Sequence, residues 1–542
     1  MTTSTRRDLV RRHRDVFVAL LALAIWAPGA SADVVIHEIM YHPLSNADSD
    51  EFVEIFNTGG SPVDISNWCF DGVDFCFPAG GTTIGAGDFL VIANDAVGFQ
   101  TTYGFPPDHV FTPATASVLD DAGERLALID QGFVIVDELL FTDEPPWPVT
   151  PDGLGPSLEV IDATLDNSTP RNWRASLAAG GTPGAANSVA ATGLPPWIDQ
   201  IQHTQDVLPL DPVVVTARVV AATTVDLTYK IDFGGEVTLQ MLDNGSSGDG
   251  GAGDGVYGAA IPGQPIGTLV RYRITATGPT GTIRYPRADD TVTYDGTAVV
   301  DPALSSELPI LHWFIDPIDY QEALDHRLTD ETEPAVLFYD GTLYDAVETR
   351  IRGASARQWP KPPWKFFTPQ GHNFAAPGLI VNDVDTFNIQ SGYADKSYTR
   401  EVLAWETVGE AGLPAGRVFP IRVEQNGQFF GLFTFLEAPD SDFVVRNRLD
   451  VRGARYKAFE NLRMHMTIDE IVPLYEKKSR LEEDHSDLWQ LITQVNQPAT
   501  QQIHDWLADN IDIPTVVNYI AAMSIVHNND HLNKNYFLYR DT

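Results

Sequence analysis

Short runs of β-branched and aromatic residues, separated by clusters of glycine and proline, dominate the N-terminal half of the chain. FVEIF at 52–56 and FLVIA at 89–93 are typical of the runs, and TGGSP at 58–62 is typical of the breaks. Strands of this length and spacing pair with their neighbours in sandwiches or barrels. The pattern predicts one all-β domain over 33–188 and a second β domain over 195–296.

From about residue 305 the pattern changes, because amphipathic helical segments now alternate with strands. Apolar residues at helical spacing predict a helix over 474–494. Asp512 and Pro514 are typical helix-start residues, and a mostly apolar segment follows them to His527. We therefore expect a multidomain chain in which two all-β domains precede an α+β domain over 305–542.

Residues 1–32 have the composition of an export signal. Five arginines precede a short apolar core from Val16 to Trp26, and Ala30-Ser31-Ala32 forms a small-residue cleavage site. The alternative is a membrane anchor, but the apolar run is about half as long as a membrane span requires. We expect a secreted or cell-surface protein that keeps no membrane span after cleavage.

The charge balance limits the partners that this chain can have. Its 74 acidic residues against 35 basic ones give a net charge of −39 at pH 7. A surface with this charge repels the phosphate backbone of nucleic acids and anionic lipid. Nucleic acid is therefore excluded as an expected partner.

Cys69 and Cys76 are the two cysteines of the sequence, and both lie in the first β domain. In an exported protein they can form a local disulfide. Two free buried thiols are the alternative, and two cysteines alone do not make a zinc site.

The second β domain contains the glycine-rich segment LDNGSSGDGGAGDGVYG. Asp243, Asp249 and Asp254 recur in it at intervals of five or six residues. Short carboxylates on a flexible loop suit Ca²⁺, which takes oxygen ligands. Asp-Gly and Asn-Gly pairs are also ordinary hairpin-turn residues, so a plain turn is the alternative.

Several motifs of the first domain occur in the order of a known family. They are IHEIMYHP, DEFVEIFNTGGSPVDISNW, FPAGGTTIGAGDFLVIAND, PWP, GPSLEVID and GGTPGAANS. Together they resemble the lamin tail domain of the bacterial secreted type. The resemblance implies an immunoglobulin-like β-sandwich that binds or adheres and carries no chemistry of its own. The second β domain resembles a small immunoglobulin- or fibronectin-like domain.

The segment RIRGASARQWPKPPWKFF has the residue types of a phosphate site. Arg352, Gly353 and Ser355 form a short flexible loop with a hydroxyl group, and Lys361 and Lys365 follow it. Phosphate recognition needs backbone N–H groups that approach closely and a cationic side chain that neutralises charge. A basic strand beside a turn is the alternative.

Further along, Asp395 precedes a helical segment that it can cap, and Glu437 ends the second strand of a hairpin. Near the end of the sequence, Asp530 is followed five positions later by Asn535 in HNNDHLNKNYFLYRDT. Protein kinases use this offset to place a catalytic base and a metal ligand in one loop.

In this order, RIRGASARQWPKPPWKFF, DKSYTREVLAWETVGEAGLPAGRVFPIRVEQNGQFFGLFTFLEAPD and HNNDHLNKNYFLYRD resemble the spore-coat CotH kinase family over roughly 309–542. The resemblance implies an atypical secreted protein kinase that uses ATP with Mg²⁺ or Mn²⁺. By position, Asp530 is the catalytic acid/base and Asn535 a metal ligand. The resemblance assigns the remaining matched residues to the phosphate loop (Arg352, Gly353, Ser355), phosphate contact (Lys361 or Lys365), the nucleotide pocket (Glu437) and structural support (Asp395, Arg400).

The family continues with a Pro-Trp-Asp-x-Asp-type segment that supplies a metal-binding aspartate, whereas this sequence ends at Asp541-Thr542. We expect a C-terminally incomplete kinase domain, with a truncated, inactive kinase as the alternative. The expected function is transfer of the ATP γ-phosphoryl group to hydroxyls, foremost serine, of secreted or surface proteins. The alternative is a noncatalytic surface or coat scaffold with a pseudokinase domain and β-sandwich binding modules.

Overall fold

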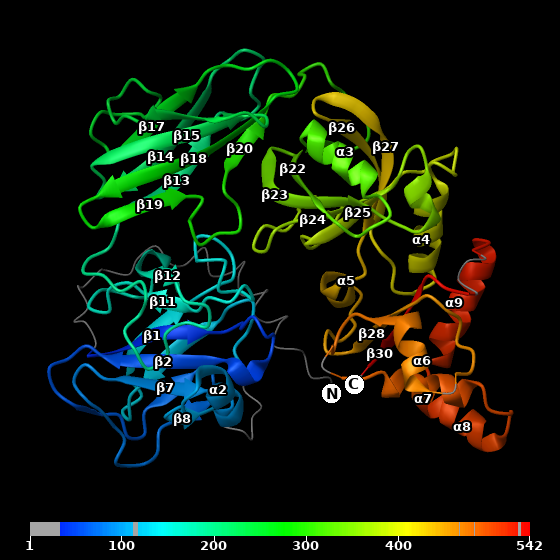
Figure 1. Cartoon of the computed structure of the whole chain (residues 1–542), viewed down its shortest axis with the longest axis horizontal. Coiled ribbons are helices and arrows are strands. Elements are labelled where there is room, and N and C mark those ends of the chain that lie inside the picture. The colour runs from blue at the N-terminus through cyan, green and yellow to red at the C-terminus, as the bar shows by residue number, and fades with distance from the viewer. Residues whose placement is uncertain (1–32, 112–117, 466, 482, 529–532, 542) are drawn as a thin grey trace. The chain divides into compact units, whose positions relative to one another are not determined.

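The computed structural model describes residues 33–111, 118–465, 467–481, 483–528 and 533–541 (Figure 1). The expected export signal over 1–32 lies outside the described residues. The chain divides into two compact units, and the first consists of the residues up to Phe141 together with Pro156–Ala191. No helix in the described ranges is both long and apolar enough to cross a bilayer.

The first unit is built from β-sheets, as predicted. Its six-stranded sheet has the order β12-β11-β1-β2-β7-β8, its four-stranded sheet the order β10-β9-β4-β5, and β3 pairs with β6. Among the described residues of this unit, one longer helix, α2 (Ala96–Tyr103), begins after Asp95, whose side chain accepts hydrogen bonds from Val97 N and Gly98 N. The strand bounds are Val34–Met40 (β1), Phe52–Asn57 (β2), Val63–Asp64 (β3), Cys69–Asp71 (β4), Phe75–Cys76 (β5), Thr83–Ile84 (β6), Phe89–Ala93 (β7), His109–Val110 (β8), Arg125–Ile129 (β9), Ile135–Leu140 (β10), Leu158–Val160 (β11) and Trp173–Ala175 (β12).

Cys69 and Cys76 lie opposite each other on the hairpin of β4 and β5 and form a disulfide. Of the two alternatives for these cysteines, the structure therefore has the local disulfide.

A row of buried glutamates crosses the larger sheet of the first unit. Glu38 on β1 lies opposite Glu159 on β11 and opposite Glu54 on β2, and all three side chains are fully buried. Glu38 Oε1 accepts hydrogen bonds from Ser157 Oγ (2.6 Å) and Thr182 N (2.8 Å). Burial raises the pKa of Glu38 and of Glu54 to about 8 in each case.

These raised pKa values predict that the first unit is less stable at alkaline pH. The folded state holds protons on Glu38 and Glu54 up to about pH 8, whereas the unfolded chain releases them near pH 4.5. Between pH 7 and 9 the free energy of unfolding therefore falls by about 1.4 kcal/mol for each such carboxyl group. Thermal unfolding of the whole chain at pH 7 and pH 9 measures this loss. Glu38→Gln, which keeps the neutral shape, should reduce the pH dependence, and an unchanged dependence would contradict the assignment.

The second unit consists of Thr142–Gly155 and the chain from Thr192 onward. Its first part is all β, as predicted, with one sheet of order β13-β14-β17 and another of order β16-β15-β18-β19 in which β20 also pairs with β18. Alternate residues of β14 and β18 fill the core between the strands, among them Val213, Val215, Tyr272 and Ile274. The bounds are Trp197–His203 (β13), Val213–Val220 (β14), Thr224–Ile231 (β15), Glu236–Gln240 (β16), Val256–Ile261 (β17), Leu269–Gly278 (β18), Gly281–Tyr285 (β19) and Asp295–Ala298 (β20).

A closed seven-stranded barrel follows, of order β21-β22-β23-β24-β25-β27-β26. It closes through parallel pairing of β21 with β26, in which Leu311 lies opposite Val423. Trp313 and Trp364 are fully buried inside it, with their ring centroids 4.8 Å apart. The bounds are Ile310–Phe314 (β21), Glu333–Tyr339 (β22), Thr342–Ile351 (β23), Trp364–Phe367 (β24), Thr386–Gln390 (β25), Val418–Gln425 (β26) and Gln428–Glu437 (β27), with α3 at Pro317–Asp325 and α4 at Arg400–Glu410.

The remainder of the chain pairs a small sheet with helices. Its three strands have the order β29-β28-β30, and Tyr456, Tyr475 and Ile492 lie in the core beneath them. The bounds are Ala454–Ala458 (β28), Tyr475–Lys477 (β29) and Tyr536–Arg540 (β30), with α5 at Ser441–Arg446, α6 at Ile468–Ile471, α7 at Ser486–Val495, α8 at Gln501–Asn510 and α9 at Ile513–Ile525.

Helix α9 begins as the sequence predicts, because the Asp512 side chain accepts from Thr515 N and Pro514 lies in the first turn. The helix predicted over 474–494 is wrong in its first half. Tyr475 and Lys477 instead pair with Ala458 and Tyr456 of β28, and the helix begins at Ser486. Pairing with a strand distant in sequence has overridden the local helical spacing.

The barrel and the preceding β domain share a packed junction. Leu269 and Ala298 pack against Phe314, Val336 and Phe338 in one buried cluster. Beside this cluster, Arg271 Nη1 and Asp345 Oδ1 form a buried ion pair of 3.0 Å. Asp345 Oδ2 also accepts a hydrogen bond from Tyr294 N (3.0 Å). The two domains predicted separately are thus joined by a common core.

The segment 142–155 extends out of the first unit and packs in the second. Trp147 and Val149 are buried there. Val149 N donates to the carbonyl of Asp289 (2.9 Å), and Arg287 Nη1 donates to the carbonyl of Pro146 (3.3 Å). The segment therefore belongs to the second unit by its contacts, although the sequence places it inside the first domain.

Candidate functional site

Strands β23 and β24 position the first cations of the site. Strand alternation directs Trp364 and Phe366 into the barrel, so Lys365 between them lies on its outer face. Arg350 of β23 lies directly opposite Lys365. The hairpin therefore places a lysine and an arginine side by side on the outside of the barrel.

Lys365 is half-buried and makes neither an ion pair nor a hydrogen bond through its amine among the described residues. Its Nζ lies 4.4 Å from the centroid of the Phe367 ring. Burial, together with the charges of Arg350, Arg352 and Lys478, lowers the pKa of Lys365 to about 8. The charge of Asp385 opposes these effects, although no ion pair joins it to Lys365 among the described residues.

The small sheet brings two more lysines to the same place. Lys457 on β28 is half-buried, and burial followed by the charges of Lys478, Arg352 and Arg350 lowers its pKa, against the effect of Glu476. Lys478, which follows β29, is exposed and forms an ion pair with Glu476 (2.5 Å). We call these five residues the cationic cluster: Arg350, Arg352, Lys365, Lys457 and Lys478.

Two carboxylates, those of Asp330 and Glu401, offset part of the positive charge of the cationic cluster. Asp330 forms ion pairs with Arg350 (2.7 Å) and with Arg357. Glu401, in the first turn of α4, is held near Arg352, and burial raises the pKa of Glu401 to about 7. Asp330 forms no ion pair with Lys457 among the described residues, but the two charges attract each other.

The phosphate loop expected from the sequence lies next to the cationic cluster. Arg352 is a member of the cluster, and Gly353 has a φ of 98°, a left-handed conformation that favours glycine. Ser355 begins a short 3-10 helix, Ser355–Gln358. Arg357 Nε donates to the Gly353 carbonyl (2.5 Å), which fixes the turn.

The structure separates the two lysines between which the sequence could not choose. Lys361 Nζ donates to the carbonyl of Leu432 and lies 4.2 Å from the centroid of the Phe433 ring. Its amine is therefore engaged with strand β27. Only Lys365 of the two belongs to the cationic cluster.

Glu437 is engaged by the protein itself. It forms a buried ion pair with Arg446 of α5 and accepts a hydrogen bond from Arg417 N (2.7 Å). These contacts fix the end of β27 and the start of α5. Asp395 likewise holds the backbone, because its carboxylate accepts from Arg400 N (2.9 Å) at the start of α4.

Asp530 lies outside the described residues. Asn535 is exposed and has a φ of 63°, and its N–H donates to the carbonyl of Ala458 (2.8 Å). Ala458 is the residue after Lys457 on β28. The structure thus places Asn535 beside strand β28, next to Lys457 of the cationic cluster.

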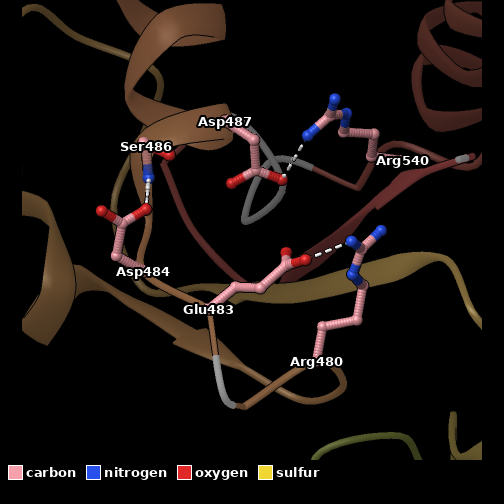
Figure 2. Close-up of a pocket in the computed structure, with 6 residues that line it drawn as sticks. All are labelled: Arg480, Glu483, Asp484, Ser486, Asp487 and Arg540. Carbon is pink, nitrogen blue, oxygen red and sulfur yellow. Dashed lines mark hydrogen bonds and ion pairs between the residues drawn. The ribbon is translucent and has the colours of Figure 1, made fainter.

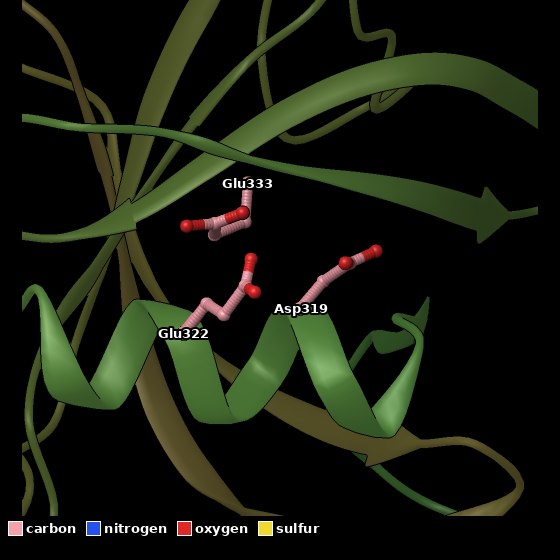
Figure 3. A group of neighbouring side chains, drawn as sticks. All are labelled: Asp319, Glu322 and Glu333. Atoms are coloured by element: carbon pink, nitrogen blue, oxygen red, sulfur yellow. The ribbon is translucent and has the colours of Figure 1, made fainter.

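Among the residues that the structure describes, two acidic groups have side chains close enough to share a cation. Asp385, Asp440 and Asp442 form one; burial and the neighbouring Asp385 raise the pKa of Asp440 to about 7. The other group lies on α3 and β22, where Asp319, Glu322 and Glu333 face one another (Figure 3).

A hollow of about 570 Å³ opens on the small sheet, lined by charged side chains with ion pairs Arg480–Glu483 and Asp487–Arg540 across it (Figure 2).

In the glycine-rich loop, the Asp249 carboxylate accepts from three backbone N–H groups, those of Asn244, Gly245 and Ser247. Asp243 and Asp254 also accept from N–H groups of the loop. Calcium binding at this loop stays a prediction.

Sequence reasoning missed four residues of the site: Arg350, Glu401, Lys457 and Lys478. Arg350 lies within the RIRG motif, two residues before Arg352, and strand alternation predicts that the two arginines share one face. Lys457 and Lys478 belong to no motif and meet the others only through tertiary contacts.

Two family models match the chain, and both predicted resemblances are confirmed. The family described as Lamin Tail Domain matches residues 27–142, and the family described as CotH kinase protein matches residues 349–542. The chain is also similar to the inner spore coat protein H of Bacillus subtilis (strain 168), with 23% identity over 242 residues. That match covers 43% of this chain and 65% of the relative, which is just under two thirds of its length.

Among solved structures, a bromine derivative of BhCBM56 matches 16% of this chain and 83% of its own, with 13% identity and a TM-score of 0.13. A laminaripentaose-producing β-1,3-glucanase of glycoside hydrolase family 64 from Paenibacillus barengoltzii, complexed with laminarihexaose, matches 35% of this chain and 55% of its own. Its identity is 12% and its TM-score 0.14. Scores this low carry no argument about fold or function.

Proposed function

We propose, from the presence of a lamin tail domain and a CotH kinase domain in one chain, that this protein transfers the γ-phosphoryl group of ATP to hydroxyls of secreted or surface proteins, foremost serine. The cationic cluster is the observation that supports this function most directly. In a chain of net charge −39, cations converge on one place between the barrel and the small sheet. Phosphoryl transfer depends on such groups to hold and neutralise phosphates.

The chemistry of the cluster fits the phosphates of ATP. Lys365 forms no ion pair among the described residues, and Arg352 directly follows β23, the strand that pairs with it, so we expect both to contact phosphate oxygens. ATP supplies the phosphoryl group, with a divalent cation, Mg²⁺ or Mn²⁺, that Asn535 would help to hold. Asp530 would orient the acceptor hydroxyl and take its proton.

The expected export signal and the similarity to a spore coat protein support a location outside the cytoplasm, in a coat or at a surface. In this proposal the lamin tail domain and the second β domain hold the kinase domain near its protein substrates.

The test is incorporation of label from ATP labelled at the γ-phosphate, measured on the whole chain with Mg²⁺ and with Mn²⁺. A protein that neither binds ATP nor transfers label would contradict the proposal and favour the scaffold.

Lys365→Met is expected to lower the rate of transfer at limiting ATP by about 10- to 100-fold, the effect of losing one charge-assisted hydrogen bond to phosphate. Lys361→Met provides the matched control, because this substitution also removes a half-buried ammonium group. The amine of Lys361 contacts the carbonyl of Leu432 and does not belong to the cationic cluster. Its transfer should stay within about threefold of the parent when both are assayed below their unfolding temperatures. The opposite ranking of the two variants would assign phosphate contact to Lys361.

A further inference from the structure

A segment that is neither helix nor strand is held by the row of buried glutamates in the first unit. It covers residues 181–189, after β12, and we call it the strap. Each glutamate of the row accepts a hydrogen bond from a different backbone N–H group of the strap: Thr182 N to Glu38 Oε1 (2.8 Å), Gly184 N to Glu54 Oε2 (2.5 Å) and Val189 N to Glu159 Oε2 (3.1 Å). The glutamates are therefore the main attachment of the strap to the sheet.

The strap adds almost nothing to the apolar core of the unit. Asn187 is the one buried residue among 181–189, all of which the structure describes. Its Nδ2 donates to the carbonyls of His37 (3.0 Å) and Val160 (2.9 Å). Hydrogen bonds thus hold the strap in place, and its release would remove no buried apolar side chain from the core.

The hydroxyl group of Thr182 lies between two of the glutamates. Its Oγ1 is 2.8 Å from Glu159 Oε1 and 3.3 Å from Glu38 Oε2. A hydroxyl group carries one proton, so it can donate to only one of the two carboxyl groups. When Thr182 donates to Glu159, which is the nearer, a hydrogen bond with Glu38 requires a proton on the Glu38 carboxyl group.

The surroundings of Glu38 favour this proton. Burial, followed by the charge of Glu54, raises the pKa of Glu38 to about 8. Burial lowers the pKa of His37 to about 4, so its imidazole, 3.0 Å from Glu54 Oε1, is uncharged at pH 7. The other titratable and charged groups that face the row from neighbouring elements are Tyr103 of α2, Asp108 before β8, and Arg174, which lies opposite Glu159 on β12. Glu38 therefore keeps its proton at pH 7 and loses it as the pH rises past 8.

We propose that the proton on Glu38 locks the strap onto the sheet, and that its loss at alkaline pH releases the strap while the strands of the unit stay paired. Without this proton, neither Glu38 nor Glu159 can donate to the Thr182 hydroxyl group. Release of the strap lets water reach the carboxylates, which relieves the cost of burying them in their charged form. The inference is independent of the proposed phosphoryl transfer, because it concerns the first unit alone.

Hydrogen–deuterium exchange of the whole chain, followed by mass spectrometry of its peptides, tests this lock. The protection factor compares each exchange rate with that of an unfolded peptide at the same pH, so it removes the intrinsic effect of pH. The locked strap keeps the Glu38 proton up to about pH 8, whereas a hydrated carboxyl group loses it near pH 4.5. Protection of peptides that span 181–189 should therefore fall at least about tenfold between pH 7 and pH 9. Peptides of β2, which lies between β1 and β7, should stay more strongly protected at both pH values.

Three variants separate the Glu38 proton from other causes. Glu38→Gln has no proton to lose, and its amide can donate to Thr182 Oγ1, so it should reduce the fall in protection about tenfold. Glu138→Gln makes the same change at an exposed glutamate of β10 and should leave the fall as it is in the parent. Gly181→Ala should unlock the strap even at pH 7, because Gly181 has a φ of 79° and a methyl group there would collide with Glu38 Oε1 and Ser157 Oγ.

Three results would overturn the inference. Strap protection that is unchanged between pH 7 and pH 9 in the parent would show that no proton locks the strap. An equal fall in the parent and in Glu38→Gln would assign the effect of pH to a group other than Glu38. Equal protection of strap and β2 peptides at pH 9 would show that the strap opens only when the whole unit unfolds.

Discussion

Asp530→Asn is expected to lower the rate of phosphoryl transfer from ATP by a factor of about 10²–10⁴, the range measured when a general base is lost. The amide keeps the size of the side chain but cannot accept the proton of the acceptor hydroxyl. Binding of ATP should change little, because the proposed phosphate contacts are made by Lys365 and Arg352 and not by Asp530. The measurement is label incorporation at saturating ATP, together with calorimetric binding of ATP.

Asp469→Asn makes the same chemical change in the first turn of α6 and serves as the control. Its transfer rate should match that of the parent within about twofold, as expected for an exposed substitution away from the site. If Asp530→Asn keeps the parent rate, the assignment of Asp530 from its offset to Asn535 is wrong. A residue other than Asp530 would then have to accept the proton.

Asp345→Ala should destabilise the second unit by about 3–5 kcal/mol, the effect of removing one partner of a buried ion pair. The substitution leaves Arg271 charged in a place where its side chain is 10% exposed, and it removes the acceptor of Tyr294 N. Arg271 keeps one neutral acceptor, the carbonyl of Asp232. Denaturant unfolding followed by tryptophan fluorescence measures the loss, because Trp313 and Trp364 lie in the adjoining barrel.

The exposed pair Arg218–Asp199 is the matched control for this experiment. Its side chains are 46% and 33% exposed, and its atoms are 3.4 Å apart. Asp199→Ala should change the free energy of unfolding by less than about 1 kcal/mol. Replacing both members of the buried pair, as in Arg271→Met with Asp345→Leu, should recover much of the loss. Equal small effects at both pairs would show that the junction does not stabilise the barrel.

The family resemblance and the strand pattern predict different parts of this molecule. Trp364-Lys365-Phe366 lies in β24 with its lysine on the outer face of the barrel, an arrangement that follows from local strand alternation. The closure of the barrel is not readable in the same way, since it depends on Leu311 pairing with Val423, more than a hundred residues away. The matched CotH region begins only at residue 349, after two of the seven barrel strands.

The candidate site likewise has residues that the sequence predicts and residues that only the tertiary structure brings in. The RIRG motif predicts a loop that can hold phosphate, and the structure pairs its first residue, Arg350, with Lys365 across β23 and β24. Glu437 was assigned to a nucleotide pocket, a role that stays a prediction, whereas its ion pair with Arg446 depends on the approach of α5. Lys457 and Lys478 entered the site through the pairing of β28 with β29, which the helical spacing of 474–494 had concealed.

The path of the chain through 142–155 determines how this protein responds to proteolysis. A protease that cuts between 191 and 195 breaks one covalent connection of the first unit, but the segment with Trp147 and Val149 stays embedded in the second unit. Such a nick leaves the two fragments associated under native conditions, and they separate only in denaturant. A fragment of residues 33–188 made alone exposes these two apolar side chains to solvent, which favours its aggregation.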